Sequence, residues 1–167
     1  NKPHKNLARL VEAFAEVKTE RKLVLAGKED PRYSEAHEVT KQLGLQDRVV
    51  FLGQVSEDDL PALYSGAALF VFPSLYEGFG LPLLEAMACG VPAISSSTSS
   101  LPEIAGQAAV MVDPLDLSQL ARALERVLGD SNLRASMREE GLKQAARFSW
   151  ERTAKETLAV YRQVLSR

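Results

Sequence analysis

The sequence predicts an α/β fold, a Rossmann-like doubly wound parallel sheet. Short, continuous apolar runs alternate with amphipathic helical stretches along most of the chain, which is the pattern of buried parallel strands joined by helices. The right-handed crossover rule then leaves the doubly wound sheet as the main candidate. No repeat, linker or low-complexity tract interrupts the 167 residues, so residues 1–167 are expected to form a single domain.

The first half of the chain should alternate helix and strand three times. Apolar residues at 3.6-residue spacing predict the first helix, with Asn6 as its N-cap. Gly44 follows the second helix, in the position where a left-handed residue ends a helix. The expected elements are a helix over about 6–19, a strand over 23–27, a helix over 32–43, a strand over 49–53, a short helix over 56–65 and a strand over 68–73.

The second half should add two strands and end in helices. An apolar stripe from Leu117 to Leu128 marks one of these helices. The expected elements are a helix over 81–89, strands over 91–94 and 109–112, a short helical piece over 101–105, and three terminal helices reaching about 128, 147 and 165. The count of strands is therefore five, in a sheet covered by helices on both faces.

Composition excludes several classes of function. Twenty Lys and Arg against 22 Asp and Glu give a formal charge of -2, so no broad basic field is present and nucleic acid is not an expected partner. The single cysteine, Cys89, excludes an internal disulfide, and two histidines, His4 and His37, are too few for a His-rich metal site. No apolar stretch approaches the roughly 20 residues of a membrane helix, so a soluble, cytoplasmic protein without a bound metal is expected.

The segment from Pro73 to Glu85 is the main candidate site. It follows a predicted strand and opens a helix, and in an open parallel sheet ligands bind beyond the carboxyl ends of the strands. Gly78 and Gly80 allow close approach of the backbone, and the free N–H groups at a helix start attract phosphate. A tight turn without a ligand is an equally good interpretation, because Leu83 replaces the third glycine of the dinucleotide fingerprint.

Glu85 adds a second indication. It is the one charged residue between Leu81 and Ile94, and a buried carboxylate without hydrogen-bond donors costs several kcal/mol. We expect it to be buried and to accept hydrogen bonds from the two hydroxyls of a nucleotide ribose. A capping box is excluded because Pro82 occupies the position of its Ser or Thr, whereas a structural ion pair with Lys or Arg remains an alternative.

Other polar residues near this segment have two interpretations each. Glu77 either contacts a ligand or is simply solvated, and Lys5 either gives its charge to a phosphate or lies on the surface. The hydroxyl-rich stretch from Ser95 to Ser100 either contacts a ligand or caps the next helix. Ser56 with Asp59 is interpreted as a helix cap. The sequence contains no G-x-S-x-G elbow, no P-loop and no D-x-D metal pair.

Taken together, these residues resemble a known family. Glu77 to Glu85, read E-G-F-G-L-P-L-L-E, is similar to the E-x7-E motif of retaining glycosyltransferases of the GT-B fold, family 4, often called glycosyl transferases group 1. The flanks agree with this resemblance, which covers nearly the whole chain. They are Lys5-Asn6-Leu7, Val50-Phe51-Leu52-Gly53-Gln54-Val55, Leu101-Pro102-Glu103-Ile104-Ala105-Gly106 and Val112-Asp113-Pro114.

The resemblance implies a role for each matching residue in a C-terminal domain that binds a nucleotide sugar. Glu85 would hold the ribose hydroxyls, Lys5 the diphosphate, and Glu77 would lie against the donor sugar as the residue commonly assigned a catalytic role. The remaining binding residues would be backbone groups around Gly78, Phe79, Gly80 and Leu81 for the diphosphate and sugar, and Gly53, Gln54 and Val55 for the nucleobase side. No cofactor is implied, because the UDP- or GDP-linked sugar is a substrate.

The resemblance also implies parts that this sequence does not include. In the family, an opening strand that lies centrally in the sheet, and that carries a second cation for the diphosphate, precedes the lysine, and an N-terminal domain binds the acceptor. The chain is therefore expected to be a fragment or to be completed by another polypeptide. Any membrane association would come through the absent domain or a lipid-linked acceptor.

The predicted function is transfer of a hexosyl group, with mannosyl or glucosyl favoured, from a nucleoside diphosphate sugar to a hydroxyl acceptor with retention of configuration. This piece would bind the donor and would turn over little or nothing by itself. Two alternatives stay open. One is a non-catalytic interaction module of the same fold, and the other is a GT-B-like epimerase or phosphorylase.

Overall fold

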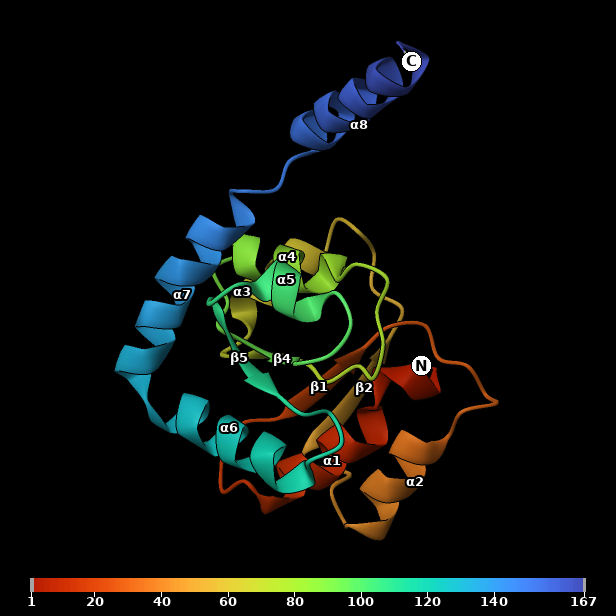
Figure 1. Ribbon diagram of the computed structural model, residues 1–167. Coiled ribbons are helices and arrows are strands. Elements are labelled where there is room, and N and C mark those ends of the chain that lie inside the picture. The colour runs from red at the N-terminus through yellow and green to blue at the C-terminus, as the bar shows by residue number, and fades with distance from the viewer. Residues whose placement is uncertain (1, 167) are drawn as a thin grey trace.

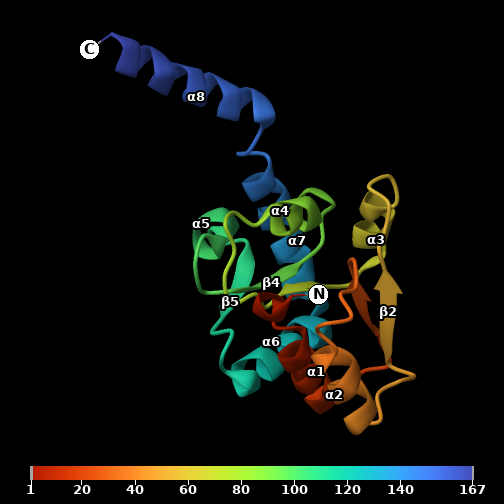
Figure 2. The same cartoon turned by 90° about the vertical axis from the view of Figure 1, so that its right-hand side faces the viewer.

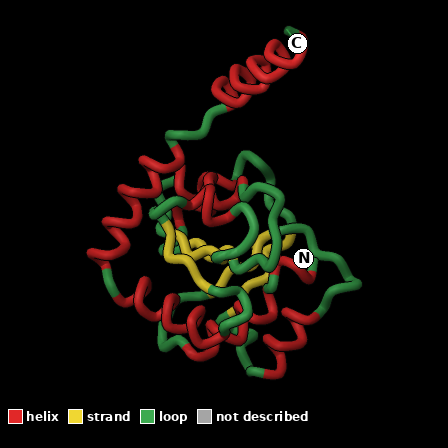
Figure 3. Tube along the Cα trace, viewed as in Figure 1, coloured by secondary structure: helices red, strands yellow, loops and turns green. Residues whose placement is uncertain are grey.

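The structure is a computed structural model that describes residues 2–166. The strands and helices alternate along the chain as predicted, and the α/β class with parallel strands is confirmed (Figures 1 and 3). The strands are β1 Leu23–Ala26, β2 Val49–Gly53, β3 Phe70–Phe72, β4 Ala93–Ser96 and β5 Ala109–Val112. The helices are the 3-10 turn η1 Pro3–Lys5, α1 Leu7–Glu16, α2 Glu35–Gln42, α3 Leu60–Gly66, α4 Leu81–Ala88, α5 Leu101–Ala105, α6 Leu117–Gly129, α7 Ser131–Ala145 and α8 Trp150–Leu165.

The strands form two parallel sheets. β1 pairs with β2, from Leu23 opposite Val49 onward, and the order β3-β4-β5 makes the second sheet. Among residues 2–166 no backbone ladder joins the two sheets. A central opening strand, as the resemblance implies, would lie between such sheets in a doubly wound order. All pairings are parallel, so within each sheet the carboxyl ends of the strands share one edge.

One apolar layer crosses both sheets in spite of the break between them. It is formed by α1 and α6, with Leu25 and Val49 from the first sheet and Ile94 from the second. The opposite face of the second sheet packs under α4 and α5, where Ala93 points away from its neighbour Ile94. Figures 1 and 2 show α1, α2 and α6 on one side of the strands and α4 and α5 on the other.

The expectation that helices cover both faces of every strand is wrong for the first sheet. Val24 in β1 is 44% exposed and Leu52 in β2 is 47% exposed. In the same two strands, Leu25 and Val49 are buried in the cluster that contains α1 and α6 residues. A continuous apolar run in the sequence does not show which of its alternate side chains will be covered.

The helical C-terminal part is confirmed, and its last helix is separate from the core. α7 packs against α4, with Met137 buried. α8 extends away from the rest of the chain in both views (Figures 1 and 2) and buries none of its residues. Trp150 and Leu165 are 76% and 85% exposed. In residues 2–166, the helices are too short or too polar to cross a bilayer.

Candidate functional site

The loop from Pro73 to Gly80 leads from the carboxyl end of β3 into α4, as predicted. Gly80 is the N-cap of α4 and has a φ of 120°, a backbone conformation that residues other than glycine rarely adopt. A Cβ added there would lie 2.8 Å from Leu101 Cδ2. Pro82 occupies the first turn, where its missing N–H removes no helical hydrogen bond. The free N–H groups of this turn are thus presented at the carboxyl edge of the sheet.

The N-terminal turn η1 is tied to this loop. The Leu75 amide donates to the carbonyl oxygen of His4 at 2.7 Å. Asn6 is at the N-cap position of α1 as predicted, but its φ is 58° and its side chain makes no cap hydrogen bond. Its amide nitrogen donates instead to the carbonyl oxygens of Pro73 at 3.1 Å and Pro114 at 2.8 Å. Asn6 therefore fixes Lys5 beside the loops that follow β3 and β5.

Lys5 and Glu77 form an ion pair in front of α4. Lys5 Nζ lies 2.7 Å from Glu77 Oε1 and 5.1 Å from the centre of the Phe72 ring. The Glu77 side chain is 13% exposed and that of Lys5 33% exposed, so the pair is partly removed from water. The two residues are 72 positions apart in the sequence. The structure thus brings together the predicted phosphate lysine and the predicted sugar-facing glutamate.

The hydroxyl-rich loop after β4 neither caps α5 nor stays free. Ser100 makes no side-chain cap hydrogen bond; its hydroxyl lies 3.0 Å from the carbonyl oxygen of Glu77 and 2.7 Å from that of Phe79. The Glu77 amide donates to Ser99 Oγ at 3.1 Å, and Thr98 donates to the Leu75 carbonyl at 3.2 Å. This loop therefore holds the 75–79 backbone in place, an interpretation that the sequence did not provide.

Glu85 lies one turn inside α4, on its exposed face. The expectation that Glu85 is buried is therefore wrong. Because water solvates its carboxylate, burial does not oblige Glu85 to have a hydrogen-bond donor within the protein. Tyr64 in α3 donates its hydroxyl to Glu85 Oε2 at 3.0 Å. No Lys or Arg within residues 2–166 forms an ion pair with Glu85, so the structural ion-pair alternative finds no support there.

The other predicted binding residues lie in two places. Gly78, Phe79 and Leu81 surround the start of α4, with Phe79 and Leu81 each nearly half exposed. In the other sheet Gly53 ends β2, and Gln54 and Val55 follow it. The Gly27 amide donates to the Gly53 carbonyl at 2.8 Å. Among residues 2–166, no hydrogen bond joins this second group to Lys5, Glu77 or Glu85.

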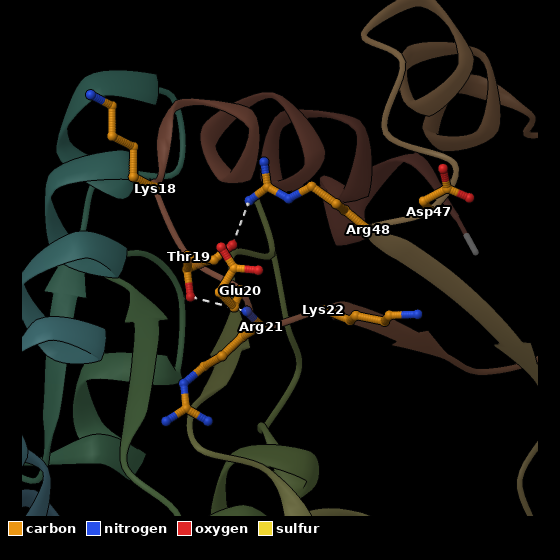
Figure 4. Close-up of a pocket in the computed structure, with 7 residues that line it drawn as sticks. All are labelled: Lys18, Thr19, Glu20, Arg21, Lys22, Asp47 and Arg48. Carbon is orange, nitrogen blue, oxygen red and sulfur yellow. Dashed lines mark hydrogen bonds between the residues drawn. The ribbon is translucent and has the colours of Figure 1, made fainter.

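A cavity of about 650 Å³ lies away from these residues, at the amino ends of β1 and β2. Figure 4 shows that Lys18, Arg21 and Lys22 point in different directions around it, while Arg48 reaches back toward Thr19. Its charges do not converge on one point, so it is a weak candidate for a ligand site. Within residues 2–166 no group of three or more His, Cys, Asp or Glu side chains could hold a metal ion.

Comparison with known proteins decides the family. The family described as "Glycosyl transferases group 1" matches residues 2–144. The chain belongs to this family. A relative from Escherichia coli, O-antigen chain mannosyltransferase B, is 37% identical over 164 residues, which are 96% of this chain and 43% of that protein. This group 1 chain therefore spans less than half the length of that relative.

Solved structures place this group 1 chain in the C-terminal half of the GT-B fold. HepE from Anabaena, in complex with UDP and glucose, superposes with a TM-score of 0.87 at 25% identity, over 99% of this chain and 46% of that one. The C-terminal domain of the group 1 protein LpcC from Francisella tularensis superposes with a TM-score of 0.78 at 27% identity, over 88% of this chain and 80% of that one.

Sequence reasoning missed Tyr64 as a member of the site. The helix that carries it was expected over 56–65, and α3 was found at Leu60–Gly66. The predicted contact between Ser56 and Asp59 is present, since Ser56 Oγ donates to Asp59 Oδ2 at 2.6 Å and accepts from the Asp59 amide. It closes the turn before α3, however, and the N-cap position of α3 is Asp59. The available signal was weak. Helices flanking one strand of a doubly wound sheet are neighbours, but this does not reveal which side chains meet.

Proposed function

We propose that this chain binds a nucleoside diphosphate sugar at the carboxyl edge of β3. It would serve as the donor-binding part of a retaining glycosyltransferase that moves a hexosyl group, mannosyl or glucosyl, to a hydroxyl acceptor. The observation that carries the proposal is the Lys5–Glu77 pair at 2.7 Å in front of the glycine-opened start of α4. A cation and a helix N-terminus together favour a diphosphate.

The same arrangement suits the chemistry of transfer. The bond between the anomeric carbon and the diphosphate oxygen breaks, the acceptor oxygen bonds to that carbon, and the acceptor's hydroxyl proton passes to the leaving diphosphate. The leaving diphosphate takes the electron pair, and its charge would be stabilised by Lys5 and by the N–H groups around Gly80 and Leu81. Glu77 would face the donor sugar from the Lys5 side, where the resemblance places the carboxylate assigned to catalysis.

The nucleoside would extend along α4 toward Glu85. This carboxylate is exposed and has one hydrogen bond from Tyr64, so it retains acceptor sites for two ribose hydroxyls. The exposed loop of Gly53, Gln54 and Val55 would meet the nucleobase side. The complex of HepE with UDP and glucose supports a UDP-linked sugar as the donor.

The acceptor would be bound elsewhere in the whole enzyme. The chain covers 43% of the mannosyltransferase relative and 46% of HepE, so a large part of each relative has no counterpart in these residues. The 167-residue chain by itself is expected to turn over little or nothing. Catalysis needs the acceptor placed against the anomeric carbon and water excluded from the site.

Calorimetric titration of UDP, GDP and ADP into the protein tests the proposal. We expect one of the three to bind, and Glu85→Ala to weaken that binding about tenfold or more because the ribose hydroxyls lose a charged acceptor. Glu139→Ala is the matched control, since Glu139 lies on the exposed face of α7 and should leave the affinity unchanged. Absence of binding by all three nucleotides, or equal affinities of both variants, would contradict a donor site.

A further inference from the structure

Tyr64 connects α3 to the proposed ribose-binding carboxylate. α3 packs against α4, and the Tyr64 hydroxyl donates to Glu85 Oε2 at 3.0 Å across that contact. No other group among the described residues hydrogen-bonds to the Glu85 carboxylate. The orientation of Glu85 therefore depends on Tyr64.

The phenol ring itself is held in place. It meets the Phe70 ring of β3 edge to face, with centroids 5.5 Å apart and planes at 78°, a favourable arrangement for two aromatic rings. Burial of Tyr64, followed by the negative charge of Glu85 and its hydrogen bond, raises the pKa of the phenol well above its ordinary range. The hydroxyl thus stays protonated, and remains a donor, at neutral pH.

A carboxylate on an exposed helix face has several rotamers, and fixing one of them costs conformational entropy. A donor on a rigid neighbouring helix fixes that rotamer before any ligand arrives, which lowers the cost of binding. The Tyr64 hydroxyl occupies one acceptor site on Oε2. The remaining lone pairs of the carboxylate can accept from two vicinal hydroxyls.

We propose that Tyr64 is a positioning residue, which orients Glu85 to receive the vicinal hydroxyls of the nucleotide ribose. The inference rests on the proposed function, because it names the device by which that site would recognise the ribose. It assigns to α3 a part in selecting nucleotides with both ribose hydroxyls over those that lack them. Tyr64 itself need not touch the ligand.

The test compares two ligands on three proteins by calorimetry. The first ligand is UDP, GDP or ADP, whichever binds the wild type most tightly, and the second is the 2′,3′-dideoxy form of the same nucleotide. Tyr64→Phe keeps the ring against Phe70 and removes only the hydroxyl. Tyr161→Phe is the matched control, because Tyr161 lies exposed on α8.

We expect Tyr64→Phe to weaken binding of the ribonucleotide about fivefold and to leave binding of the dideoxynucleotide unchanged. The ratio of the two affinities then falls about fivefold, whereas Tyr161→Phe keeps the wild-type ratio. A structural role for Tyr64 would weaken both ligands equally. That result, or an unchanged affinity for the ribonucleotide, overturns the inference while the donor site stands. If the wild type binds no nucleotide, the proposed function and this inference fall together.

Discussion

At the scale of single residues, the environment of a charged side chain depends on its contacts in the fold more than on its neighbours in the sequence. The types of the residues in E-G-F-G-L-P-L-L-E predicted a candidate site here, and the structure places Glu77 before the start of α4 and Glu85 within its second turn. The burial of Glu85 was predicted wrongly from its apolar sequence neighbours, because a helix has an exposed face even in an apolar run. The partners Lys5 and Tyr64 are long-range contacts, which spacing cannot give.

Substitutions of the two members of the Lys5–Glu77 ion pair should change nucleotide affinity in opposite directions. Glu77→Gln removes the negative charge beside Lys5, so UDP or GDP should bind about threefold more tightly, as suits a partly exposed pair worth roughly 0.7 kcal/mol. Lys5→Met should weaken binding about tenfold, because it removes the cation itself. Calorimetric titration of each variant at one fixed ionic strength measures both effects.

Lys143 and Glu140 on α7 supply the control for these variants. They form an ion pair of the same 2.7 Å length, and both side chains are exposed. Glu140→Gln and Lys143→Met should leave nucleotide affinity unchanged. Weaker nucleotide binding in Glu77→Gln would mean that the carboxylate contacts the nucleotide favourably and that Lys5 is not free to serve the diphosphate.

At the scale of elements, alternation of apolar runs and helices predicted every strand and every α-helix, with bounds within a few residues, but not the 3-10 turn η1. What the pattern could not give was how the elements meet. Asparagine is a common N-cap residue, yet the Asn6 side chain donates hydrogen bonds to the carbonyl oxygens of Pro73 and Pro114. Carbonyl groups distant in the sequence here compete with the helix end for the side chain. The Thr98–Ser100 hydroxyls likewise hold the 75–79 loop.

The entry into α4 yields a prediction of stability. Gly80→Ala places a Cβ 2.8 Å from Leu101 Cδ2 at a φ of 120°, and such backbone strain costs about 1 to 3 kcal/mol. Gly78→Ala is the matched control two residues earlier, where an added Cβ meets no atom within 4 Å. Urea denaturation should show a lower free energy of unfolding for Gly80→Ala and a change within about 0.5 kcal/mol for Gly78→Ala. Equal effects of the two substitutions would contradict the close packing of α4 on α5.

At the scale of the whole molecule, the two sheets depend on the α1–α6 layer for their connection. Leu25 and Ile94 belong to different sheets and to one buried cluster. Side-chain packing therefore joins the two sheets, which no strand-to-strand ladder connects among residues 2–166. The apolar pattern of the sequence predicted one covered sheet and gave no sign of the break between the two sheets. Hydrophobic periodicity identifies strands, but strand order and pairing are set by contacts distant in the sequence.

The independence of α8 from this core gives the last prediction. The helix buries none of its residues and leaves Trp150, Tyr161 and Leu165 exposed, so it contributes little to the packed core. A chain that ends at Ser149 should keep the full chain's free energy of unfolding within about 0.5 kcal/mol. Leu120→Ala, which removes a fully buried α6 side chain from the shared core, should instead cost about 2 to 5 kcal/mol. Urea denaturation of the three proteins, followed by circular dichroism at low concentration, measures both. A loss on truncation as large as that of Leu120→Ala would show that α8 packs onto the domain in solution.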